Sequence, residues 1–242
     1  CYLRNESTPL FTSVDFISNI AANSGGAIVL KDDADAVMNN VSMVDNIAEG
    51  LGGGLYINNA DPSLDYVLVS GNIASAGGGV YIRNDCAPIF NNTTVAFNSS
   101  GFEGGGVYLR DNSFLSVTNS IFWENGNSQI YFRDSGDEVS LNISYSLVEN
   151  GQNGIDTNNN GDLTWGLGML QGDPYFCNGE SGNFSLRENS PCITAADDGG
   201  IIGYIGVGCG PINTGPIWYV GELGNNSSDG SIETPFLTIQ RA

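Results

Sequence analysis

Short hydrophobic runs return along this chain at a nearly constant interval. Each run holds about three apolar or aromatic residues and ends at a charged or amide side chain, and four of the six follow a glycine pair or triplet. The copies occupy residues 1–5, 25–32, 52–59, 77–84, 104–111 and 130–134. Equivalent positions are separated by 27, 27, 25, 27 and 23 residues, a length typical of one coil of a solenoid.

A second motif lies between these runs, in which an apolar residue stands three positions before an asparagine. Each period therefore contains two or three strand-like runs separated by Gly, Asn, Asp and Ser turns, and no stretch of ten residues has a helical periodicity. Helical solenoids are excluded. Leucine-rich repeats would need several leucines per repeat, and propeller blades need about 40 residues. The pattern predicts an all-β parallel β-helix.

The recurrent asparagines are expected to form a ladder. Coils of a β-helix stack about 4.8 Å apart, so equivalent residues form columns, and glycine suits bends that lie directly on other bends. Stacked amides can bond to one another and to turn backbone groups that would otherwise be buried without partners. The predicted ladder residues are Asn19, Asn46, Asn72, Asn98, Asn125 and Asn150.

A basic column and a tyrosine column lie side by side in the same repeat. Like charges about 5 Å apart repel, so a row of arginines requires carboxylates or a ligand to neutralise it. The favoured interpretation is a solvated edge paired with nearby acids and packed tyrosines; the alternative is a stripe that binds an anion or a sugar. The residues of this candidate stripe are Arg83, Arg110, Arg133, Tyr81, Tyr108 and Tyr131.

Composition excludes several functions. The 242 residues include 27 acidic and 7 basic side chains, no His and a formal net charge of −20. This charge repels phosphate backbones and anionic lipids, which excludes nucleic-acid binding. Without His there is no Ser-His-Asp or Cys-His catalysis. No apolar run approaches the roughly 20 residues of a membrane span, so membrane insertion is not expected.

Asn-x-Ser/Thr triplets are frequent and favour a secreted protein located outside the cell or at its surface. Asn98 carries such a triplet but is assigned to the ladder, so it is the least expected to bear a glycan. The candidate glycosylation sites are Asn5, Asn40, Asn92, Asn142, Asn183 and Asn226.

One segment has part of a calcium-loop pattern, and no other cofactor is predicted. Its oxygen-bearing residues are Asp156, Asn158, Asn160 and Asp162. Gly161 takes the sixth position of the loop, but Leu167 stands at the twelfth, where Glu is expected. A polar turn explains the segment equally well, and Asp32–Asp35 is a weaker candidate.

The pairing of Gly-Gly-Gly/Ala-apolar runs with Phe-x-x-Asn resembles the repeats of polymorphic outer-membrane proteins and related right-handed parallel β-helix proteins of the pectate-lyase-like superfamily. The resemblance covers residues 1 to about 153 and recurs six times. It implies a right-handed β-helix of about six coils within residues 1–170. Because such folds serve adhesins, surface proteins and polysaccharide enzymes alike, it does not by itself assign a function.

The rest of the chain resembles the ends of large secreted bacterial β-helix proteins. Residues 171–210 are similar to their closing segment, in which a Cys177–Cys192 disulfide would close a loop of about 15 residues and Cys209 could replace either cysteine. Residues 211–216 form a linker. Residues 217–242 resemble the strand and short capping helix that begin such proteins, which implies a neighbouring module or copy at the open first coil.

These observations predict a non-catalytic, extracellular structural or adhesive module of a large surface protein or fibre. Its expected partners are other copies of itself or adjacent modules of the same chain, and glycans. The alternative is a polysaccharide-binding protein, lyase or hydrolase. A lyase of this superfamily needs carboxylates for Ca²⁺ and a basic residue, and the candidates are Asp111, Asp134, Asp137, Arg110 and Arg133. Each is an ordinary member of a repeat, whereas catalytic residues should interrupt it.

Overall fold

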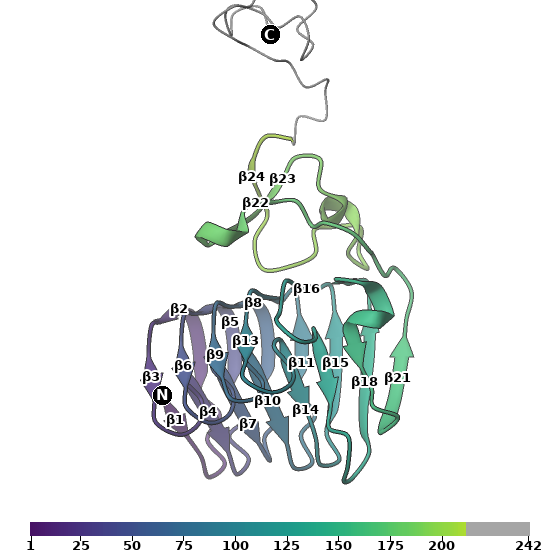
Figure 1. Cartoon of the computed structure of the whole chain (residues 1–242). Coiled ribbons are helices and arrows are strands. Elements are labelled where there is room, and N and C mark those ends of the chain that lie inside the picture. Colours follow the sequence, from purple (N-terminus) through teal and green to yellow (C-terminus); the bar gives the residue numbers. More distant parts are fainter. Residues whose placement is uncertain (212–242) are drawn as a thin grey trace, which may run out of the picture. The chain divides into compact units, whose positions relative to one another are not determined.

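A computed structural model describes residues 1–211, which form one compact unit. They build a parallel β-solenoid followed by a closing segment (Figure 1). The right-handed parallel β-helix predicted from the sequence is confirmed. The predicted linker beyond Pro211 and the predicted cap at 217–242 lie outside the described residues. Within residues 1–211, no helix is both long and apolar enough to cross a bilayer.

The first sheet contains the glycine-led runs of the repeat. Its seven parallel strands follow one another in chain order, so the stack has one level more than the six copies recognised in the sequence. The added level is the last strand, which pairs Ile155 with Ile130. The strands are β1 (Tyr2–Leu3), β4 (Ile28–Lys31), β7 (Leu55–Asn58), β10 (Val80–Arg83), β14 (Val107–Leu109), β17 (Ile130–Phe132) and β20 (Ile155–Asp156).

The second sheet holds the longest strands of the solenoid. In the first three coils each strand is continuous, and in the next three it divides in two. The equivalent position has a left-handed backbone in both kinds of coil, for example at Asn40 within β5 and at Asn92 between β11 and β12. The strands are β2 (Leu10–Ile17), β5 (Val37–Val44), β8 (Ser63–Ser70), β11 (Ile89–Asn91), β12 (Thr94–Ala96), β15 (Phe114–Thr118), β16 (Ile121–Trp123), β18 (Val139–Ser144), β19 (Leu147–Val148) and β21 (Gly161–Trp165).

A third, narrow sheet completes each early coil, and apolar side chains from all sides fill the interior. The narrow sheet consists of β3 (Ile20–Ala21), β6 (Ile47–Ala48), β9 (Ile73–Ala74) and β13 (Ser99–Ser100). Because side chains of a strand alternate between its faces, every second residue points inward. Met38, Leu64 and Phe90 occupy equivalent inward positions in successive coils and are fully buried.

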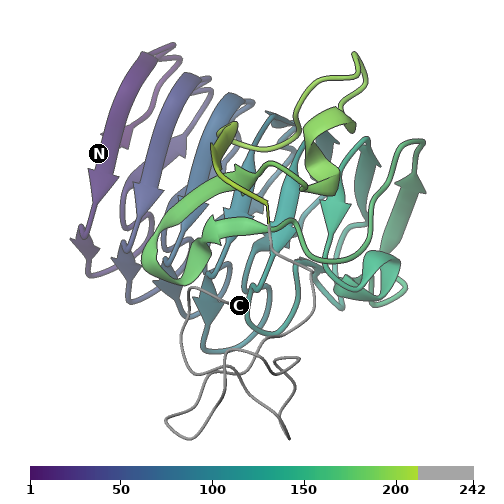
Figure 2. The same ribbon diagram turned by 90° about the horizontal axis from the view of Figure 1, so that it is seen from above.

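The closing segment has its own small sheet, which lies across the outer face of the second sheet (Figure 2). Leu186 and Ile202 pack against Ile121 and Leu147 of the solenoid, so the apolar outer face of these coils is buried. Besides the solenoid strands already given, the chain contains η1 (Gly151–Gly154), β22 (Phe176–Asn178), η2 (Gly179–Ser181), β23 (Asn183–Arg187), η3 (Pro191–Thr194) and β24 (Val207–Cys209).

The disulfide of the closing segment joins Cys177 to Cys209. The Cys177–Cys192 pairing considered first was wrong, and the open alternative in which Cys209 takes the place of Cys192 is the one observed. Cys192 is fully buried as a free thiol in the contact with the solenoid. The Cα atoms of Cys177 and Cys209 lie 6.0 Å apart, within the range of a disulfide, whereas Cys192 in η3 is turned inward against the solenoid.

Candidate functional site

Five asparagines form a continuous ladder along the solenoid. The Nδ2 atoms of Asn19, Asn46, Asn72 and Asn98 each donate to the Oδ1 atom of the next asparagine, at 2.8–2.9 Å. The same Oδ1 atoms also accept the backbone N–H of the preceding asparagine. Each buried Oδ1 atom therefore accepts hydrogen bonds from both the side chain and the backbone N–H of the neighbouring asparagine, so these buried groups all have partners.

The ladder continues from Asn125 to Gln129, and the prediction that Asn150 is its last member was wrong. Asn125 donates to Gln129 Oε1 at 2.7 Å, and Gln129 donates to Glu149 Oε2 at 2.7 Å. Because Phe122 pairs with Val148, the position equivalent to Asn125 is Gly151, and Asn150 lies one residue too early. Asn150 instead adopts a left-handed backbone at the start of η1.

The glycine triplets permit the tight stacking of these turns. A Cβ atom added to Gly105 would overlap the backbone oxygen of Gly126 in the next coil. Real Cβ atoms do not approach a backbone atom so closely, and backbone cannot rotate away as a side chain can. The triplets are therefore explained by coil-to-coil contact, without a phosphate or other ligand.

Three arginines of the column share one carboxylate, that of Asp111. Asp111 lies 2.6 Å from Arg110 Nε, 3.4 Å from Arg133 and 3.6 Å from Arg83. Arg110 also donates to the Tyr81 hydroxyl at 3.3 Å. Burial alone would lower the pKa of Arg110, but the hydrogen bonds with Asp111 and Tyr81 outweigh it and raise that pKa. The guanidinium groups are thus held in place by protein contacts.

The tyrosine column forms a stack beside the arginines. The ring centroids of Tyr81 and Tyr108 are 4.8 Å apart with nearly parallel planes, and those of Tyr108 and Tyr131 are 5.1 Å apart. Burial, with a smaller contribution from the neighbouring tyrosines, raises the pKa of Tyr108 to about 12. Tyr81 and Tyr131 are buried, so the rings pack mainly on one another and leave little surface for a ligand.

The other acidic candidates are not gathered into a site. Asp134 and Asp137 are exposed, and Asp134 accepts a hydrogen bond from Ser135. In the calcium-like segment, Asp156 belongs to β20 and Asp162 to β21, on different sheets. Asn158 and Asn160 use their amides to donate to the carbonyls of Phe132 and Arg133. Within residues 1–211, no group of three or more acidic or cysteine side chains could hold a metal ion.

The candidate glycosylation sites differ in accessibility. Four of them are exposed, namely Asn5, Asn40, Asn142 and Asn183. Asn92 is 7% exposed and Asn98 is buried in the ladder, so neither presents its amide to the outside. Asn226 lies outside the described residues.

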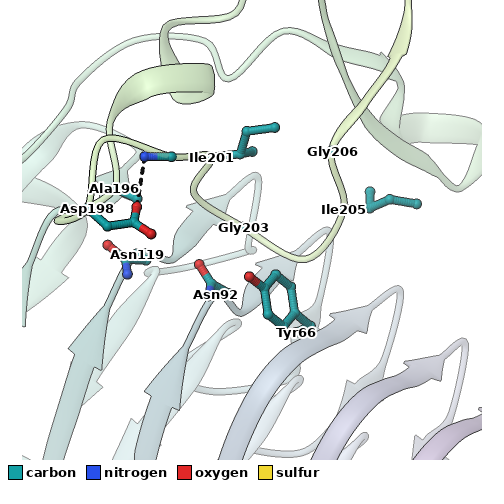
Figure 3. Close-up of a pocket in the computed structure, with 10 residues that line it drawn as sticks. Tyr66, Asn92, Asn119, Ala196, Asp198, Ile201, Gly203, Ile205 and Gly206 are labelled. Atoms are coloured by element: carbon teal, nitrogen blue, oxygen red, sulfur yellow. Dashed lines mark hydrogen bonds between the residues drawn. The ribbon is translucent and has the colours of Figure 1, made fainter.

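A cavity that the sequence did not reveal lies between the second sheet and the closing segment (Figure 3). We call it the closing-segment cavity; its volume is about 350 Å³. Two backbone contacts fix its roof, since Gly203 N–H donates to Asn119 O at 2.8 Å and Tyr204 N–H to Thr94 Oγ1 at 2.9 Å. The residues that line it are Tyr66, Asn92, Asn119, Ala196, Asp198, Gly200, Ile201, Gly203, Ile205 and Gly206.

Comparison with known proteins shows the family of the solenoid. No curated protein matches the chain. No solved structure matches it either. A family described as the right handed beta helix region matches residues 2–165, which span the repeats and both large sheets. The chain therefore belongs to the right handed beta helix family.

Proposed function

We propose that this chain is a non-catalytic, extracellular structural or adhesive module that stacks end to end on another β-helix coil. The observation that carries the proposal is the open edge of the first coil. There β1, β2 and β3 each pair on one side only. Unpaired strand edges recruit other strands, and this edge has the register of a solenoid.

The side chains of the first coil support the same proposal. Phe11, Val14 and Phe16 point inward but remain partly exposed, whereas their equivalents in the second coil are fully buried. Asn19 donates to the ladder, yet within residues 1–211 its own Oδ1 accepts no hydrogen bond. A coil ending in an amide donor would cover the apolar surface and complete the ladder. We infer that such a coil comes from an adjacent module or from another copy of the chain.

Several groups that a lyase would need are already engaged. Asp111 is surrounded by three guanidinium groups, and Arg110 has a raised pKa, which opposes its use as a base. An extracellular location agrees with the Cys177–Cys209 disulfide, because such bonds persist in oxidising compartments, and with the four exposed glycosylation triplets.

Electron microscopy of the protein, with intact mass measured on the same preparation, tests the proposal. We expect end-to-end fibres, or at least stacked oligomers. Val14→Lys should disperse them, because it places a charge on the open interior of the first coil. Leu10→Lys is the matched control, since Leu10 lies on the same strand but is 69% exposed on the outside. Discrete monomers of the unaltered chain would overturn the proposal.

The alternative function then has its own assay. If the protein is monomeric, cleavage of polyuronates should be measured with the unaltered chain and with Arg110→Ala and Arg133→Ala. Cleavage that both substitutions abolish would favour the polysaccharide lyase, and cleavage independent of them would exclude the arginine column as its site.

A further inference from the structure

The closing-segment cavity is lined by a largely buried asparagine, Asn92, whose amide has no protein partner within residues 1–211. Asn92 is 7% exposed, and within residues 1–211 its side chain makes no hydrogen bond with any other group. Its neighbours differ: Asn91 donates to Asp65 at 2.9 Å, and Asn119 both donates to and accepts from Asp197 at 3.0 Å. Asn92 lines the cavity, so its unpaired amide presents a free donor and a free acceptor there.

The same cavity is bordered by a strained aromatic residue. Tyr66 has φ of 51°, in the left-handed region that Asn tolerates and bulky residues rarely adopt. Its column shares this backbone conformation, and two of its other members are Asn40 and Asn92. The Tyr66 ring is 45% exposed and borders the cavity below the loop of Gly203 and Ile205 (Figure 3). Because the left-handed backbone recurs throughout the column, Tyr66 is distinguished by its exposed aromatic ring beside the cavity.

The remaining lining restricts the chemistry of a ligand. No basic residue lines the cavity, while Asp198 places a carboxylate in it, and the chain is strongly acidic overall. Anions are therefore disfavoured. Asp198 Oδ1 accepts from Gly200 N–H at 2.8 Å, which orients the carboxylate. Ile201 and Ile205 supply apolar surface. The volume falls at the lower end of the range for small-molecule sites.

We propose that the closing-segment cavity binds one neutral sugar residue of a glycan. Asn92 and Asp198 hydrogen bond adjacent hydroxyl groups, which need both donors and acceptors, and the apolar C–H face of the sugar packs on the Tyr66 ring. The site lies on the second sheet, away from the arginine and tyrosine columns of the first. The inference rests on the adhesive part of the proposed function and names its ligand class.

Saturation-transfer NMR with the whole chain tests the site. The probes are glucose, galactose, mannose, N-acetylglucosamine and their short oligomers, with glucuronate as the anionic control. We expect saturable binding of at least one neutral sugar and none of glucuronate. Asn92→Asp preserves shape and backbone preference but removes the amide donor and adds a charge, and we expect at least tenfold weaker binding. Asn40→Asp is the matched control, since Asn40 occupies the same column outside the cavity, and it should leave binding unchanged.

A second variant separates binding from folding. Tyr66→Asn replaces a strained ring by a residue suited to its backbone, so we expect a higher Tm together with loss of sugar binding. Absence of saturable binding by every neutral sugar, or equal binding by the unaltered chain and both cavity variants, would overturn the inference. End-to-end assembly is observed separately, by electron microscopy. A chain that stacks but binds no sugar would therefore contradict this inference alone, and not the proposed stacking.

Discussion

The solenoid and the closing segment are stabilised in opposite ways. In the solenoid every anchor recurs, so that Asn72 both donates to the amide of Asn98 and accepts from that of Asn46. In the closing segment each important contact occurs once: the Cys177–Cys209 disulfide, and the paired hydrogen bonds between Asn119 and Asp197.

Because of this difference, a substitution in the solenoid and one in the closing segment should destabilise different extents of the structure. Each asparagine of the ladder forms hydrogen bonds with groups in two neighbouring coils. Removal of an interior member should therefore disrupt the turns of several coils. A single contact in the closing segment has no equivalent to replace it, yet its loss should release that segment alone. The following predictions test this contrast.

The largest effect should follow from breaking the ladder at its centre. Asn98 donates to Val69 O and Asn125 Oδ1 and accepts from Asn72. Asn98→Ala leaves these buried groups unpaired, so we expect the free energy of unfolding to fall by about 4 kcal/mol. Urea denaturation followed by circular dichroism measures it. Asn19→Ala, at the open edge, should lose about 1 kcal/mol or less; equal losses would contradict this difference between interior and edge members.

Removing the disulfide should release only the closing segment. Cys177 and Cys209 are separated by 32 residues, for which loop-closure entropy corresponds to about 3.7 kcal/mol. After reduction, hydrogen exchange should accelerate in residues 171–211 while amides of β10 and β14 remain protected. A Cys177→Ser/Cys209→Ser variant should exchange in this way with or without reductant. Equal acceleration throughout the solenoid would show that the two regions unfold together.

Alkaline pH should weaken the contact around Cys192. Burial raises the pKa of this thiol from 9.0 to about 12, so the unfolded chain loses the proton first. The contribution to stability is intact below pH 9 and falls between pH 9 and 12, by about 1.4 kcal/mol per pH unit. Urea titrations that follow Trp123, which packs against the closing segment, measure the loss. Cys192→Ala should flatten this pH dependence, and an unchanged slope would contradict the assignment.

The smallest effect concerns the arginine column. Asp111→Asn removes the carboxylate shared by three arginines whose side chains are 21–32% exposed. Because solvent screens such pairs, we expect a loss of about 1 kcal/mol that decreases as salt screens the repulsion between arginines. Asp134→Asn, at an exposed carboxylate without an arginine partner in the described structure, is the control. A loss that grows with salt would argue against charge repulsion.

The repeat made much of the fold predictable. A fixed period sets the register, which is why the columns of Tyr81 and Arg110 follow from the sequence. The prediction for Asn150 was wrong because this asparagine lies one residue before the position equivalent to Asn125. Gln129 was not predicted because it lies outside the asparagine column and reaches the ladder from the turn after Asn125. The closing-segment cavity was not predictable, since it depends on contacts such as Tyr204 with Thr94, 110 residues apart, which no periodicity records.

The hydrogen bonds from one side-chain amide to the next all run in one direction along the ladder, and this gives the solenoid a polarity. Each amide donates to the next amide on its C-terminal side until Gln129 donates to the carboxylate of Glu149, and a carboxylate accepts hydrogen bonds but donates none. The ladder thus ends at Glu149, while at its other end the Oδ1 atom of Asn19 has no donor among the residues that the structure describes. A polymer of such modules would add subunits through unlike ends, so its two tips would differ in growth rate and only one could be blocked by a free amide donor.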